Sequence, residues 1–131
     1  MNLSSVRLIV RDLKKLVAFY EAVTALPARW LNDDFAEIRT GTSTLALGSE
    51  RTVKLFAEGA ARAGENHTAI IEFLVDDVDA VFARLDGVVT ELVQPPTTMP
   101  WGNRSLLFRD PEGNLINVFA PVTDAARQRF R

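Results

Sequence analysis

The 131-residue chain contains no cysteine and a single histidine, His67. The absence of cysteine excludes disulfide scaffolds, zinc fingers, iron–sulfur sites and thiol nucleophiles. A single histidine excludes every mechanism that needs two imidazoles, and no G-x-S-x-G nucleophile elbow is present to work with it. These two absences remove several common classes of enzyme before any motif is considered.

No charge of one sign dominates the chain, which has 15 Lys and Arg against 17 Asp and Glu and a net charge of −2. It therefore has no basic field that would attract nucleic acid or an anionic membrane. No apolar run reaches membrane-spanning length, and the N-terminus lacks the features of a secretion signal. We expect a cytoplasmic protein without nucleic-acid or membrane partners. An apolar content of 47% fits one globular domain.

The hydrophobic pattern predicts one order of elements twice. The first half predicts a helix from Leu13 to about Ala25, capped by Asp12, and strands at 6–10, 28–31, 35–39 and 43–47. A linker follows at 49–66, with a helical turn expected near 55–62. The second half predicts a helix at 78–85, capped by Asp77, and strands at 69–75, 88–93, 104–109 and 115–119. Asp110–Asn114 reads as a tight turn, and Thr123–Asp124 as the cap of a C-terminal helix.

The two halves superpose at an offset of 65 residues. Val10-Arg11-Asp12-Leu13 aligns with Val75-Asp76-Asp77-Val78. We therefore predict one α+β domain made of two tandem βαβββ modules. Its expected segments are module 1 at about 3–48, the linker at 49–66, module 2 at about 67–121 and a C-terminal tail or helix at 122–131.

Four motifs give this duplication a family likeness. They are V-R-D-L at 10–13, V-D-D-V at 75–78, W-G-N-R at 101–104 and F-R-D-P-E-G-N-L-I-N-V at 108–118. With them, the chain resembles the vicinal oxygen chelate superfamily, also called the glyoxalase/bleomycin resistance/dioxygenase superfamily, over about residues 3–121. The resemblance implies curved mixed sheets with helices outside, a U-shaped cleft between the modules and a homodimer, for which the long linker would permit domain swapping.

Metal enzymes of that superfamily place one ligand on each of four strands. The resemblance assigns these positions to Ser5, to Thr44 or Leu45, to Ile70 and to Asn117. Such side chains do not form a site for Zn²⁺, Fe²⁺, Ni²⁺ or Mn²⁺, which prefer imidazole and carboxylate. His67 lies three residues from Ile70 and has the opposite strand parity. We therefore expect no metal and no cofactor.

Strand parity predicts which side chains would face the cleft. Arg7 and Glu72, equivalent at the 65-residue offset, would orient a polar ligand group or form a structural ion pair between the halves. Trp101 and Trp30 could stack on a planar ligand or pack on the barrel rim. Pro95, Pro96 and Pro100 predict a stiff loop at the cleft mouth. The predicted ligand-binding residues are Arg7, Trp30, Glu72, Trp101, Asn103, Asn117 and Phe119.

The resemblance and the candidate residues leave three functions open. The first is a metal-free small-molecule-binding protein of the bleomycin-resistance, antibiotic-binding type, which does no chemistry on its ligand. The second is a lyase, isomerase or dioxygenase-like enzyme with a degenerate or displaced site, which would need His67, Glu72 or Glu37 in unexpected registers. Glu72 with Arg7 is the candidate for metal-free acid–base chemistry, and His67 could be a lone base. The third is a structural or regulatory dimer with a closed cavity. The missing metal ligands favour the first.

Overall fold

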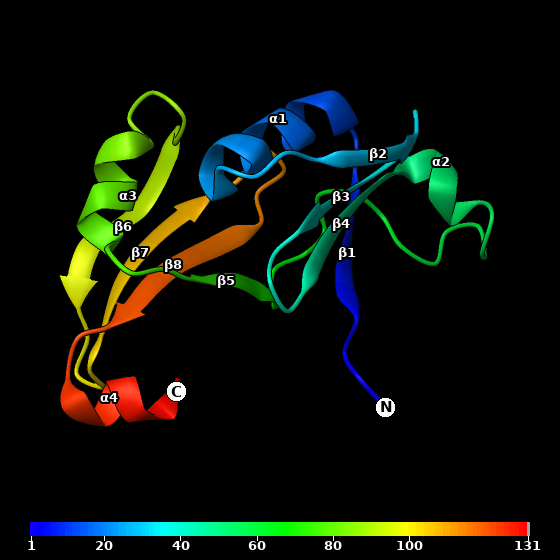
Figure 1. Ribbon diagram of the computed structural model, residues 1–131. Helices are drawn as coiled ribbons and strands as arrows, with labels where there is room; N and C mark the ends of the chain where they lie inside the picture. The colour runs from blue at the N-terminus through cyan, green and yellow to red at the C-terminus, as the bar shows by residue number, and fades with distance from the viewer. Residues whose placement is uncertain (131) are drawn as a thin grey trace. The chain divides into compact units, whose positions relative to one another are not determined.

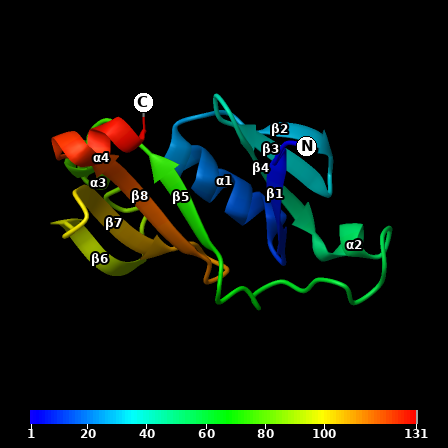
Figure 2. The same ribbon diagram turned by 90° about the horizontal axis from the view of Figure 1, so that it is seen from below.

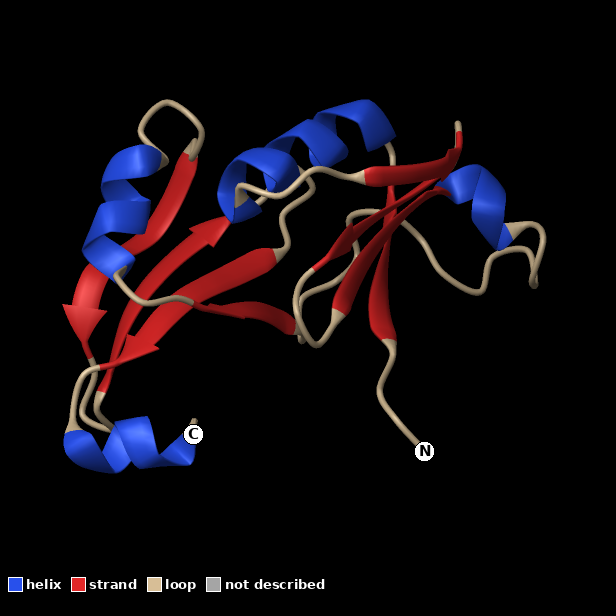
Figure 3. Cartoon of the chain, viewed as in Figure 1, coloured by secondary structure: helices blue, strands red, loops and turns tan. Residues whose placement is uncertain are grey.

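The computed structural model describes residues 1–130 in two compact units, Met1–Asn66 and a second that begins at His67. Each unit has a strand, a helix, three strands and a short helix in that order (Figure 1, Figure 3). The first contains β1 (Ser5–Val10), α1 (Leu13–Thr24), β2 (Arg29–Asn32), β3 (Phe35–Arg39), β4 (Thr44–Ser49) and α2 (Glu50–Val53). The second contains β5 (Ile70–Leu74), α3 (Val78–Arg84), β6 (Glu91–Thr98), β7 (Asn103–Arg109), β8 (Leu115–Pro121) and α4 (Asp124–Arg129).

The two sheets have the same topology. Their strand orders are β1-β4-β3-β2 and β5-β8-β7-β6. In each, the first strand runs parallel to the last, and the remaining neighbours are antiparallel. The predicted α+β fold of two βαβββ modules is therefore confirmed.

Both long helices begin at the aspartate that the sequence pattern predicts. The carboxylate of Asp12 accepts a hydrogen bond from the Lys15 backbone N–H at 3.2 Å, and that of Asp77 accepts one from the Ala80 N–H at 3.0 Å. Each satisfies a backbone donor that the first helical turn leaves free. The apolar faces behind these caps are buried, as Leu16 and Val78 show.

The Asp-Pro-Glu-Gly-Asn segment forms the turn between β7 and β8. Asp110 is 3% exposed, and its Oδ1 accepts the backbone N–H groups of Glu112 and Asn114 at 2.8 and 3.0 Å. Its Oδ2 accepts the Asn114 side-chain amide at 2.8 Å. Gly113 has a φ of +87°, a conformation that favours glycine. The turn thus fixes the register of the hairpin by its own hydrogen bonds.

Two segments differ from the sequence-based expectation. β6 runs to Thr98 through Pro95 and Pro96, which were predicted to form a loop. It is the edge strand and its register shifts on both sides of Gln94, so prolines without an N–H are tolerated there. In the linker, the helix occupies Glu50–Val53, directly after β4, and the residues near 55–62 form only turns.

The C-terminal helix α4 packs on the end of the second sheet (Figure 2). Thr123 caps it by accepting the Ala126 N–H at 3.2 Å, as predicted. Gly102, at a φ of +92°, allows the start of α4 to lie close to the turn before β7, because a Cβ at position 102 would collide with the Thr123 hydroxyl. Within residues 1–130, no helix has the length and apolar character needed to cross a membrane.

Candidate functional site

In the second unit, Glu72 and Asn117 lie side by side on one face of the sheet. Their Cα atoms are register partners on the parallel strands β5 and β8, and Leu107 on β7 is the next partner. We call this the Glu72 face; it consists of Ile70, Glu72, Leu74, Asn103, Ser105, Leu107, Arg109, Leu115, Asn117, Phe119 and Pro121. Cross-strand partners point to the same side, so the predicted parity of these strands holds.

A hydrogen bond fixes the Asn117 amide. Its Nδ2 donates to Glu72 Oε2 at 2.7 Å. This directs Asn117 Oδ1 the other way, and that oxygen is buried without a hydrogen-bond partner among residues 1–130. An unpartnered buried carbonyl oxygen is unfavourable, and a donor from a bound molecule would relieve it. The exposed Glu72 side chain therefore presents carboxylate oxygens on this face, and one Asn117 N–H is used within the pair.

Asn103 is a second buried acceptor, but it lies elsewhere on this face. It is 8% exposed, and its Oδ1 also has no hydrogen-bond partner in the described part of the chain. It is four residues along β7 from Leu107, or about 13 Å at about 3.3 Å per residue. The row of Ser105 and Phe119 separates it from Asn117, so the structure does not bring the two amides together.

Phe119 contacts an aromatic residue that the sequence analysis passed over. Its ring centroid lies 5.3 Å from that of Phe130, and its side chain is 8% exposed. The sequence analysis assigned residues 122–131 to a C-terminal tail or helix and named no site residue there. Its one usable signal was a single large aromatic residue among charged neighbours.

Trp101 is well exposed in the second unit. It is 61% exposed and sits in the turn before β7, which the Gly102 N–H closes by donating to the Met99 carbonyl at 2.9 Å. The indole ring is therefore accessible for stacking on a ligand, and the hydrogen-bonded turn fixes the backbone that carries it.

In the first unit, Arg7 occupies the position equivalent to Glu72. Its register partner is Ala46 on β4, and Ala46 in turn partners Glu37 on β3. We call this the Arg7 face; it consists of Ser5, Arg7, Ile9, Phe35, Glu37, Arg39, Thr44, Ala46 and Gly48. Trp30 pairs with the fully buried Ala36, which has the opposite parity. The structure therefore does not bring Trp30 to the face that carries Arg7.

The register also corrects the fourth metal position. Ser5 pairs with Thr44 as Ile70 pairs with Leu115, so the equivalent of Asn117 is Ala46 rather than Thr44 or Leu45. Leu45 is 6% exposed and has the parity of the core side chains. Serine, alanine, isoleucine and asparagine do not fit a catalytic divalent metal, because they supply neither imidazole nor carboxylate. His67 is exposed and lies before β5.

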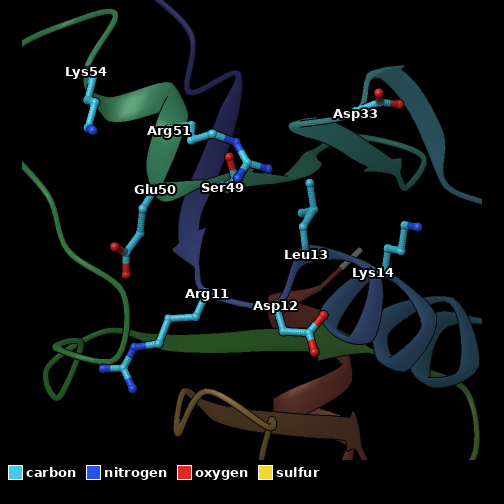
Figure 4. Close-up of a pocket in the computed structure, with 9 residues that line it drawn as sticks. All are labelled: Arg11, Asp12, Leu13, Lys14, Asp33, Ser49, Glu50, Arg51 and Lys54. Atoms are coloured by element: carbon cyan, nitrogen blue, oxygen red, sulfur yellow. The ribbon is translucent and has the colours of Figure 1, made fainter.

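The first unit has a pocket of about 900 Å³ that sequence reasoning did not single out. Figure 4 shows the residues that line it. Its lining comes from the start of α1, the β2–β3 turn and α2, and mixes both signs of charge: Arg11, Asp12, Leu13, Lys14, Asp33, Ser49, Glu50, Arg51 and Lys54. Several of these groups hold the fold together. Asp12 caps α1, Arg11 donates to the Ala63 carbonyl at 3.3 Å, and Arg51 pairs with Asp34 at 2.6 Å.

Two surface ion pairs shift the titration of their carboxylates. Hydrogen bonds from Arg51 and then Ser49 lower the pKa of Asp34 below its ordinary value of 3.8. The hydrogen bond from Arg104 likewise lowers the pKa of Asp79. Both bridges join separate elements of one unit, since Arg104 lies on β7 and Asp79 on α3. These shifts reflect structural pairing at the surface rather than a catalytic environment.

A protein-family model and a curated relative each match most of the chain. The model of the Glyoxalase/Bleomycin resistance protein/Dioxygenase superfamily matches residues 2–118. The chain is 33% identical over 126 residues to the uncharacterized protein YraH of Bacillus subtilis, a match that covers 91% of this chain and 98% of that protein.

Solved structures match the fold along nearly the whole chain. One is a glyoxalase/bleomycin resistance protein/dioxygenase family enzyme from Burkholderia phytofirmans PsJN, at a TM-score of 0.81 and 20% identity, covering 93% of this chain and 100% of that one. Another is a lactoylglutathione lyase from Agrobacterium tumefaciens, at a TM-score of 0.70 and 22% identity, covering 91% and 92%. At these identities the likeness concerns the fold.

Proposed function

Because the chain belongs to the glyoxalase/bleomycin resistance protein/dioxygenase superfamily, we propose that it is a metal-free member that binds a small molecule on the Glu72 face. One observation carries the proposal. At the position where a metal ligand is expected, Asn117 turns its amide N–H toward Glu72 and leaves a buried Oδ1 without a partner. A ligand with N–H or O–H donors would satisfy that oxygen and meet the Glu72 carboxylate beside it.

The surroundings of this pair favour a ligand with an apolar or aromatic body. Leu107 adjoins Asn117 in the register, and Ile70 and Leu74 on β5 are about half exposed. Apolar side chains around a few fixed polar groups are typical of small-molecule sites. The ligand class is therefore a molecule with a donor-bearing, preferably cationic, end and an apolar body. The homodimer implied by the family resemblance stays a prediction.

The proposal is tested first by metal content. Protein dialysed against buffer without chelator should retain far less than one equivalent of Zn, Fe, Ni or Mn by elemental analysis. Stoichiometric retention of any of them would overturn the metal-free assignment and favour the alternative, an enzyme of the superfamily with a displaced metal site.

Binding is tested with benzamidine, a planar aromatic cation that carries N–H donors. It should raise the melting temperature of the wild type, since a ligand at 100 times its Kd stabilises a protein by about 2.7 kcal/mol. Asn117→Leu and Glu72→Gln should each weaken this effect. The matched control is Glu58→Gln, a substitution at an exposed carboxylate in the first unit. Equal responses of all four proteins to benzamidine would refute the assigned site.

A further inference from the structure

The first unit has a cation held in an unusual setting. The Cζ atom of Arg7 lies 4.6 Å from the ring centroid of Phe35 and 5.1 Å from that of Phe56. Phe35 comes from β3, and Phe56 from the turn after α2, where the Phe56 N–H donates to the Val53 carbonyl at 3.0 Å. Two aromatic rings from separate segments thus contact one guanidinium, and each contact stabilises its charge.

Within residues 1–130, the guanidinium N–H groups of Arg7 donate to no protein acceptor. The two ring contacts are the only polar or aromatic interactions of its side chain in this part of the chain. Two other arginines of this unit form ion pairs: Arg39 pairs with Glu37 at 3.1 Å, and Arg51 with Asp34 at 2.6 Å. Glu37 is the carboxylate in the same cross-strand row as Arg7, and Arg39 already engages it.

This arrangement leaves a specific set of donors for a ligand. A guanidinium packed against rings still presents N–H groups at its edge, in a planar fork that matches two coplanar oxygens. The position between Arg7 and Glu37 in the row is Ala46, whose short side chain cannot reach across to the guanidinium. Next to the guanidinium, Phe56 is 74% exposed and its neighbour Leu55 is 86% exposed. An oxyanion with an apolar body would bind the guanidinium N–H groups with its oxygens and pack its body on these exposed apolar side chains.

We propose that Arg7, Phe35 and Phe56 form a binding site for an organic carboxylate. The carboxylate accepts two N–H bonds from the edge of the guanidinium, and the apolar body of the ligand packs on the exposed Phe56 ring. This site lies in the first unit and does not depend on the proposed function of the Glu72 face. It requires an anion, whereas the Glu72 face requires a donor-bearing molecule.

The test is a titration with benzoate, followed by NMR through the arginine Nε–Hε resonances. Benzoate should shift the Arg7 resonance saturably and bind more tightly than acetate, which has no ring to pack. Arg7→Lys should raise the Kd for benzoate about tenfold, because a lysine cannot form the bidentate pair. Phe56→Leu should weaken the binding of benzoate more than the binding of acetate. Arg62→Lys, at an exposed arginine that pairs with Glu65, is the matched control and should bind as the wild type does.

Several results would overturn this assignment. One such result is that benzoate shifts the Arg62 resonance as strongly as that of Arg7. Another is that benzoate binds Arg7→Lys and the wild type with equal Kd. Either result would mean that Arg7, Phe35 and Phe56 have only a structural role. Inorganic phosphate binding as tightly as benzoate would exclude selection for an organic carboxylate. Urea midpoints of each variant, compared with the wild type, separate loss of binding from loss of fold. The binding of benzamidine is measured in parallel, because its loss would indicate a failure of the site proposed on the Glu72 face rather than of the Arg7 site.

Discussion

The hydrogen bonds of Asp110 make the turn between β7 and β8 a quantitative test of how the second unit is held together. Replacing Asp110 with alanine removes three acceptor contacts, from the N–H groups of Glu112 and Asn114 and from the Asn114 side chain. At about 1 kcal/mol net for each bond, the loss is about 3 kcal/mol, and more if the buried donors stay unsatisfied. That is a large part of the 5–15 kcal/mol typical of a domain.

Asp110→Asn is the matched variant, because it keeps one oxygen in place. That oxygen can still accept the two backbone N–H groups that Oδ1 receives, while the new amide nitrogen faces the Asn114 amide and loses the third bond. We expect a loss of about 1–1.5 kcal/mol. The two substitutions should therefore differ by about 2 kcal/mol, although both remove the same charge.

Urea unfolding followed by tryptophan fluorescence measures this difference. The chain has two tryptophans, one in each unit, so a Trp30→Phe background leaves Trp101 to report on the second unit. With a slope of about 2 kcal/mol per molar urea, Asp110→Ala should lower the midpoint by about 1.5 M. Equal midpoints for the alanine and asparagine variants would refute the assignment of the stability to the two backbone N–H bonds.

Two further predictions concern the packing and the ion pairs of the second unit. Gly102→Ala should destabilise the protein more than Gly113→Ala: both glycines have positive φ, at +92° and +87°, but only at Gly102 does a Cβ meet the Thr123 hydroxyl. The difference in unfolding free energy isolates the packing of α4, and hydrogen exchange should show reduced protection there; equal effects would mean that backbone strain alone matters. For Asp79, a pKa lowered in the folded state means that pairing with Arg104 stabilises the protein above pH 3.8 and that this contribution is lost as the pH falls through the folded pKa. The difference between the urea midpoints of wild type and Asp79→Asn should shrink from pH 7 to pH 2 and with added salt, whereas a difference independent of pH would contradict it.

Both units place an aromatic residue against the sheet shortly after the last strand, which alignment of the two halves at a fixed offset does not reveal. In each unit the last strand is followed by a short helix, and an aromatic residue from that helix or the turn after it contacts a residue on the first or last strand of the sheet. Phe56 reaches Arg7 on β1, and Phe130 reaches Phe119 on β8. Both units therefore have an aromatic contact at this place, but the partner differs: it is a guanidinium in the first unit and a phenyl ring in the second.

The sequence by itself determined the elements whose signals are local. The aspartates at 12 and 77 mark helix starts because a carboxylate accepts a free backbone N–H, and the 110–114 turn is closed by its own side chains. Alternation along β1 and β5 predicted the side of the sheet for Arg7 and Glu72 because side chains in a strand point to opposite faces in turn. Superfamily membership followed from these same segments.

Only the tertiary structure decided which of those side chains meet. Pairing between strands sets the register, so Ala46 rather than Leu45 corresponds to Asn117, and Trp30 lies on the face opposite Arg7. The edge position of β6 decided that Pro95 and Pro96 could remain in a strand. Contacts made by Phe56 and Phe130 depend on where chain segments return in space. No local periodicity encodes such long-range contacts, because they are set by the packing of whole elements.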